Sequence, residues 1–308
     1  MRRASFGFAA LSAAALASVL ASSACGSKGN SGFDDAGDNP FIDDSGSASD
    51  APEFANDGGL IDTGTPDVQP PEPVIVVYGH SPTTLYKLDP KTKAVSVVGP
   101  FDCSQSVIDL AIDENNNAFV TSFTGFYSLD LKTAKCKSIA SGNYPNSLSF
   151  VPKGTLDPNA EALVGYFGAQ YVRIDTKTGA VSNVGTGLSG GFTSSGDIVS
   201  VKSGGTFLTV KGPSCSDCLL QVDPKTGALV QNYGSLGYAD VFGIAFWGGA
   251  VYGFTNGGQL FEVTAQNNMI KTTLVPIPNA PMGLQFWGAG SSTSVPTTGV
   301  DGGIIPVK

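Results

Sequence analysis

The chain has 308 residues, a formal net charge of −9, one histidine and five cysteines. Residues 26–72 hold eleven acidic side chains against the single base Lys28, whereas residues 73–308 hold fifteen acidic and fourteen basic side chains. The near-neutral second part has no basic patch, which excludes nucleic acid as a partner. A single histidine leaves too few ligands for an ordinary zinc site, and we expect no metal or cofactor.

The first 24 residues predict an export signal. Arg2 and Arg3 precede an uncharged stretch rich in Ala and Leu, which ends in small residues directly before Cys25. This pattern is typical of a cleaved secretion signal. With the cysteine it resembles the signal of bacterial lipoproteins, which implies a lipid on Cys25 and a place in the cell envelope, at the outer membrane or cell surface. Ordinary secretion and a retained membrane anchor are the alternatives.

Residues 25–72 are predicted to be a disordered linker. The segment is dense in Asp, Gly, Ser and Pro and has few apolar side chains. Such a composition cannot bury enough apolar surface to offset the entropy of ordering the chain. We expect this segment to tether a folded domain to the membrane.

A repeated motif dominates residues 73–288. The motif is a short apolar strand followed by a turn residue, and its copies are 85–92, 126–133, 171–179, 219–227 and 260–264. The turn residues are Asp89, Asp130, Asp175, Asp223 and Thr264. They are 41, 45, 48 and 41 residues apart, which is the length of a four-stranded propeller blade. These aspartates are turn formers, because Asp accepts hydrogen bonds from the backbone that follows it.

The repeat count predicts an all-β fold, a single β-propeller of five four-stranded blades, with six as the alternative. Four blades are complete at about 105–140, 146–185, 196–234 and 242–275. We expect an inner strand at 282–287 to complete the first blade, whose other strands lie at about 74–99. Closure of this kind removes the free sheet edge. Residues 289–308 are predicted to be a flexible tail.

The repeats resemble those of exported bacterial propellers that share a Leu-x-x-Asp-x-x-Thr-Gly turn. A second element of the resemblance is the strand entry Leu-Ala-x-Asp-x-x-Asn, present here at Leu110–Asn115. The resemblance covers about 73–288. It implies the architecture and no particular activity, because this class includes binders, sensors and a few enzymes. The acidic run at 113–117 is interpreted as a hairpin turn, because it lacks the central Gly of a calcium loop.

Four cysteines remain once Cys25 is assigned to the lipid, and an even number in an exported domain favours disulfides. Cys215 and Cys218 are expected to form a local bridge. Cys103 and Cys136 both lie near blade two and form the second expected pair.

Candidate site residues come from the loops at one propeller face and from the inner strands. The loops contribute His80, Asp102, Tyr144, Phe192, Tyr238, Asp240 and Asn279. Asp109 and Asp197 occupy the repeat position of Ser147, Gly243 and Gly283, so both should approach the axis. Two facing carboxylates are the minimum for acid–base glycoside cleavage. We favour the other interpretation, in which both accept hydrogen bonds from the backbone of the inner strands. Trp247 and Trp287 are expected to plug the opposite face.

The function favoured by these observations is a monomeric, non-enzymatic binding or scaffolding module for an envelope protein or glycan. Tyr144, Phe192, Tyr238 and Asn279 are its predicted binding residues. The alternative is a carbohydrate-active hydrolase or lyase that uses Asp109, Asp197, and either Asp240 or His80. An interaction module within an envelope complex is a third possibility.

Overall fold

The computed structural model describes residues 77–266 and 269–298. The chain divides into two units, Met1–Thr65 and Pro66–Lys308, and every described residue belongs to the second. The predicted signal, Cys25 and the linker therefore lie outside the described residues. Within the described ranges, no helix is long and apolar enough to cross a membrane.

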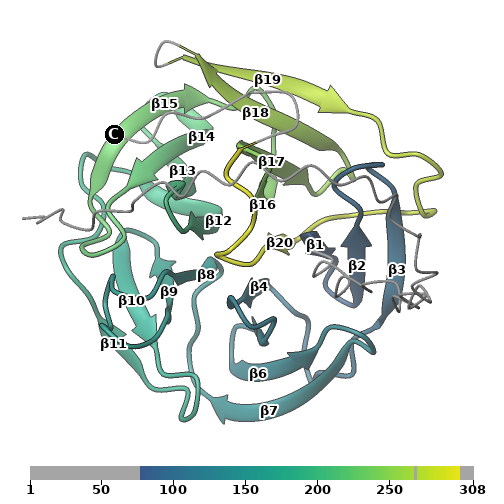
Figure 1. Ribbon diagram of the computed structural model, residues 1–308. Coiled ribbons are helices and arrows are strands. Elements are labelled where there is room, and N and C mark those ends of the chain that lie inside the picture. The colour runs from purple at the N-terminus through teal and green to yellow at the C-terminus, as the bar shows by residue number, and fades with distance from the viewer. Residues whose placement is uncertain (1–76, 267–268, 299–308) are drawn as a thin grey trace, which may run out of the picture. The chain divides into compact units, whose positions relative to one another are not determined.

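Twenty strands form five antiparallel four-stranded sheets around a common centre (Figure 1). Blade one contains β20 (Gly288–Gly290), β1 (Val77–His80), β2 (Thr84–Leu88) and β3 (Val95–Pro100). Blade two contains β4 (Asp109–Ile112), β5 (Ala118–Thr121), β6 (Gly125–Asp130) and β7 (Lys135–Ser141). Blade three contains β8 (Leu148–Val151), β9 (Ala162–Phe167), β10 (Gln170–Ile174) and β11 (Val181–Asn183). Blade four contains β12 (Thr193–Val201), β13 (Gly205–Gly212), β14 (Cys215–Val222) and β15 (Leu229–Ser235). Blade five contains β16 (Val241–Trp247), β17 (Ala250–Thr255), β18 (Leu260–Gln266) and β19 (Met269–Val275).

The predicted five-bladed propeller is confirmed, and the alternative of six blades is wrong. The repeated aspartates form turns as expected: Asp89, Asp130, Asp175 and Asp223 each accept a hydrogen bond from the backbone N–H two residues on, at 2.7–3.0 Å. Gly179 and Gly227 close two of these turns with φ of 71° and 69°, the left-handed region that glycine adopts most easily. Asp113 likewise accepts from Asn115 and Asn117, so the acidic run is a hairpin turn.

Five apolar clusters hold the blades to one another, one at each junction. The cluster between blades one and two includes Leu85 and Val120, for example, and that between blades two and three includes Phe126 and Leu163. The junction of blades five and one is sealed by Phe286, which packs against Tyr86 and Phe254. Because every blade depends on two neighbours, opening any junction exposes apolar surface on both sides.

The closing strand is not the one predicted. Residues 282–287 form no strand, and Gly288–Gly290 pair instead with His80, Gly79 and Tyr78. The reason is steric. A Cβ on Gly288 would collide with the His80 ring and lie 2.7 Å from the Asp109 carboxyl, and a Cβ on Gly290 would lie 2.9 Å from the Leu110 carbonyl. Only a strand of very small residues can enter this part of the ring.

The segment after β20 also differs from the predicted flexible tail over the residues described. Ser292 bridges to Ile112, the Thr293 carbonyl accepts from Lys202 N–H, and the Thr293 hydroxyl hydrogen-bonds Glu161. Val295 is 3% exposed in the core between blades four and five. The segment 291–297, which we call the plug, thus contacts blades two to five at the inner-strand C-terminal ends.

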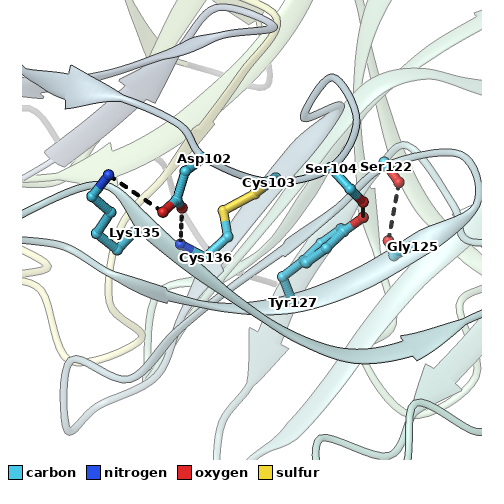
Figure 2. Close-up of a disulfide and its surroundings, with 8 residues drawn as sticks. All are labelled: Asp102, Cys103, Ser104, Ser122, Gly125, Tyr127, Lys135 and Cys136. Atoms are coloured by element: carbon cyan, nitrogen blue, oxygen red, sulfur yellow. Dashed lines mark hydrogen bonds and ion pairs between the residues drawn. A yellow bond between two sulfur atoms is a disulfide. The ribbon is translucent and has the colours of Figure 1, made fainter.

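Both expected disulfides are present. Cys215–Cys218 lies at the start of β14, and Cys103–Cys136 joins the β3–β4 connection to the outer strand β7. Figure 2 shows the second bridge flanked by Asp102, whose carboxylate accepts from Cys136 N–H at 2.7 Å and pairs with Lys135 at 3.3 Å. The Ser104 and Tyr127 hydroxyls share a further hydrogen bond at 2.7 Å. The connection between blades one and two is therefore fixed on both sides of the disulfide.

Candidate functional site

One residue from each blade, in or directly before the inner strand, lies near the propeller axis. These residues are Asp109, Ser147, Asp197, Gly243 and Gly288, and we call them the axial ring. The prediction that Gly283 belongs to this ring is wrong. A Cβ added to Gly243 would lie 2.7–2.8 Å from the Gly288–Ala289 backbone, so Gly288 is its neighbour. A Cβ added to Gly283 would have no atom within 4 Å. The shift of five residues follows from the misplaced closing strand.

Asp109 and Asp197 are fully buried and bound by backbone N–H groups of several blades. Asp109 accepts from Leu110 at 2.8 Å and from Leu148, in blade three, at 2.6 Å. Every oxygen of this carboxyl is thus engaged within the fold.

Asp197 makes the wider set of contacts. It accepts from Ile198 at 2.7 Å in its own blade, from Ile244 at 2.9 Å in blade five and from Ala289 at 3.4 Å in blade one. Hydrogen bonds to a carboxylate are stronger than those between neutral groups. One side chain therefore joins three blades where their sheets converge.

The two carboxyls also interact with each other. Burial, followed by repulsion from Asp197, raises the pKa of Asp109 well above its usual range, and burial likewise raises the pKa of Asp197. A hydrogen bond between the two side chains raises the pKa of Asp109 further and partly offsets the rise in the pKa of Asp197. Two carboxyls so close in a dry site cannot both ionise easily.

His80 adjoins this pair but does not complete an acid–base site. It is fully buried, its Nδ1 donates to the Ser81 carbonyl at 3.0 Å, and its Nε2 has no hydrogen-bond partner among the described residues. Burial lowers the pKa of His80 to about 4. The ring is therefore neutral at physiological pH and closed off from solvent.

The pKa of His80 gives a test of this closed axis. The unfolded chain takes up the proton near pH 6.5 and the folded chain only near pH 4. The contribution of His80 to the free energy of unfolding is therefore complete above pH 6.5. It falls by about 3 kcal/mol as the pH is lowered to 4, because only the unfolded chain binds the proton over this range. Because the chain has one histidine, its imidazole NMR signal can be followed directly. We expect no titration above pH 5; a midpoint near 6.5 would show that solvent reaches the ring.

The remaining predicted site residues do not gather around the axial pair. Asp240 is exposed before β16, and its N–H donates to Asp217 at 3.2 Å. Tyr144 is 3% exposed and donates to the Gly179 carbonyl at 3.1 Å, so it is a packing residue and not a binding one. Phe192 packs against blade four, Tyr238 stacks on Phe261 at 4.0 Å, and Asn279 is exposed in the loop after β19.

Directly beyond the axial ring lies a depression of about 170 Å³ to which blades one to five all contribute. Its lining residues are Ile108, Phe123, Asn146, Ser195, Gly196, Phe242 and Trp287. Five of them immediately precede the five members of the axial ring. We call this feature the axial depression.

Three of the side chains that line the axial depression are aromatic. Phe123, in the β5–β6 loop, is 63% exposed, and Phe242 and Trp287 are half-buried. Trp287 is held by Asn256, which accepts from its Nε1 at 3.0 Å. The prediction that Trp287 shares the opposite face with Trp247 is wrong, since only Trp247 ends its inner strand there, with Lys93 over its ring. Ser195 is fixed by donating to Asp217 at 3.2 Å.

The residues lining the depression were missed by the sequence analysis. The available signal was their position one residue before the ring members, which places them at the strand entries on a single face. A correct alignment of Gly288 with Gly243 would have identified Trp287 together with Phe242. The exposed Phe123 lies in an ordinary loop and has no comparable signal.

No family model matches the chain, and no curated protein matches it. Similar solved structures include a chain of the nidogen–laminin complex, with 10% identity, a TM-score of 0.44 and coverage of 71% of this chain and 99% of that one. The PQQ-bound aldose sugar dehydrogenase from Streptomyces coelicolor has 12% identity, a TM-score of 0.42 and coverage of 73% and 82%. A protein of unknown function from Bacteroides caccae has 12% identity, a TM-score of 0.36 and coverage of 69% and 76%.

Similarities this distant carry no argument about activity. The described residues also contain no group of three or more His, Cys, Asp or Glu side chains placed to hold a metal ion. The fold and the site together define a disulfide-containing five-bladed β-propeller with a sealed axis and an aromatic axial depression.

Proposed function

We propose that the chain is a lipid-anchored binding module of the bacterial cell envelope, which uses the axial depression to hold an envelope protein or glycan. The observation that carries the proposal is the exposed Phe123 at a depression built by five blades. Large apolar side chains exposed at a concave surface are a common mark of binding sites. The signal and Cys25 support the anchoring, and the acidic segment after Cys25 supports the tether.

The size of the depression limits what enters it. At about 170 Å³ it is smaller than the ~300–1,000 Å³ of most small-molecule sites. It fits one protruding ring, which is either an aromatic side chain of a partner protein or a terminal sugar. Both can stack on aromatic faces, while Asn146 and Ser195 supply polar groups at the wall.

The axial carboxyls argue against the alternative of a hydrolase or lyase. A glycosidase needs one carboxyl to protonate the leaving group and another to act on the sugar or on water. Asp109 and Asp197 are fully buried and occupied by backbone N–H groups, and His80 has no access to solvent. Their arrangement supports a structural role.

A binding screen of glycans and envelope proteins with the chain from Gly26 to Lys308 tests the proposal. We expect Phe123→Ser to lower the affinity for the captured ligand at least about tenfold, as for a residue at the centre of an interface. Because Phe123 is exposed, its loss should leave the melting temperature nearly unchanged. Val97→Ser is the matched control, since Val97 is 56% exposed on the outer strand β3. Equal binding by both variants and the parent chain would contradict the proposal.

A further inference from the structure

A second cavity lies between blades three and four, at the opposite end of the inner strands from the axial depression. It is formed where β8 and β12 end and where β14 turns into β15, and its volume is about 540 Å³. Ser195 and Gly196 at the start of β12 belong to the axial depression, whereas Ser200 and Val201 near its end line this cavity. We call it the inter-blade cleft. Its volume is within the usual range for small-molecule sites.

The inter-blade cleft has a positive rim. Lys153 enters it from blade three and Lys202 from blade four, and both are exposed. The ion pairs of the described residues are Lys135–Asp102 and Arg173–Asp157, so neither of these two lysines is neutralised. Asp223 also lines the cleft, but it accepts from Lys225 N–H at 2.7 Å within its own turn. The cleft is therefore lined by two ammonium groups and by one carboxylate that already accepts a hydrogen bond from the backbone.

Behind the rim the cleft offers neutral hydrogen-bonding groups. Gln221 is 4% exposed, and its Oε1 accepts from the Tyr233 hydroxyl at 3.2 Å, which fixes the side-chain amide. A Cβ on Gly205 would lie 3.5 Å from Gln221 Nε2, so the absent side chain keeps the cleft wall open beside this donor. Ser203 adds an exposed hydroxyl at the cleft edge.

The same cleft has an apolar side. Val201 and Val222 are buried in its floor, and Val230 is 48% exposed at its edge. A positive rim, neutral donors and an apolar wall together match a ligand that has an anionic group, several hydroxyls and a C–H face.

We propose that the inter-blade cleft binds a small polyhydroxylated anion, either a sugar acid or a sugar phosphate. Lys153 and Lys202 hold its anionic group as mobile point charges. Gln221 and Ser203 hydrogen-bond its hydroxyls, and Val230 contacts the C–H face of its ring. This site is separate from the axial depression and does not depend on the binding function proposed for it.

Titration calorimetry on the chain from Gly26 to Lys308 tests the proposal with four probes: glucuronate, glucose 6-phosphate, neutral glucose and inorganic phosphate. We expect saturable binding of at least one sugar anion, tighter than about millimolar. Neutral glucose should bind at least about tenfold more weakly, because it lacks the charge. Inorganic phosphate should also bind more weakly, because it has no hydroxyls for Gln221 and Ser203.

The variant Lys153→Gln/Lys202→Gln should lower the affinity for the sugar anion at least about tenfold. Its matched control is Lys177→Gln/Lys271→Gln, which makes the same charge change on exposed lysines outside the cleft and should leave affinity within about twofold. Equal weakening in both double variants would overturn the site, as would the absence of saturable binding of either sugar anion. Inorganic phosphate binding as tightly as glucose 6-phosphate would overturn the role of the hydroxyls. Binding only to vesicles of anionic lipid would show that the lysines recognise a membrane surface instead.

Discussion

Removing residues 280–308 should abolish the cooperative unfolding of the propeller. The truncated chain loses the closing strand β20, the buried Phe286 and Val295, and the Ala289 N–H that binds Asp197. Truncating a single buried aromatic residue already costs about 3–5 kcal/mol. Together the losses approach the ~5–15 kcal/mol that stabilises a typical domain. They also leave β1 as an open sheet edge, which favours aggregation.

Thermal unfolding followed by circular dichroism measures this effect. The control is a chain that ends at residue 298, because it keeps every contact described for β20 and the plug. We expect the control to melt in one transition and the shorter chain to show a broad loss of signal. If both chains melt alike, the closure of blade one by β20 is wrong.

Asp197→Ala should be the most damaging single substitution at the axis. It leaves the N–H groups of Ile198, Ile244 and Ala289 buried without an acceptor. Each such loss costs about 1–3 kcal/mol, which gives about 3–9 kcal/mol in total. For a domain of this size the melting temperature should fall by roughly 2–4 °C per kcal/mol.

Asp175→Ala is the comparison for this effect. Asp175 also accepts two backbone N–H groups, from Lys177 at 3.0 Å and Thr178 at 2.8 Å, but in an exposed turn where water can replace it. Its loss should cost only about 1 kcal/mol. Similar melting temperatures for the two variants would show that the axial hydrogen bonds do not join the blades as described.

The propeller could be predicted from the sequence because its determinants are local. Each blade contains a turn whose Asp binds the following backbone, and these turns recur at a blade's length. The same repeats placed Asp109 and Asp197 correctly near the axis. Their partners could not be predicted, because Leu148, Ile244 and Ala289 are distant in the sequence and become neighbours only when the ring closes.

The errors have a common physical origin in the last blade. Residues 282–287 have the apolar pattern of the earlier inner strands, with Phe286–Trp287 matching Phe246–Trp247. The ring, however, accepts only Gly288–Gly290, because His80, Asp109 and Leu110 already fill the space. Because the closing strand begins at Gly288 and not at residue 282, Trp287 lies at the axial depression. For the same reason the plug, which follows this strand, was predicted to be a flexible tail. Tyr144 was misassigned because its hydroxyl binds the next blade's turn, a contact without local signal.

The central claim is that the axial carboxyls hold the blades together while the axial depression binds the partner. The most direct test measures affinity and melting temperature for the parent chain, Asp109→Asn and Phe123→Ser with one ligand from the binding screen. We expect Asp109→Asn to melt lower but to bind the ligand with unchanged affinity while folded, and Phe123→Ser to show the reverse. The claim is contradicted if Asp109→Asn melts like the parent chain but no longer binds the ligand. It is also contradicted if the parent chain chemically converts the ligand and an Asp109→Asn variant that melts like it does not.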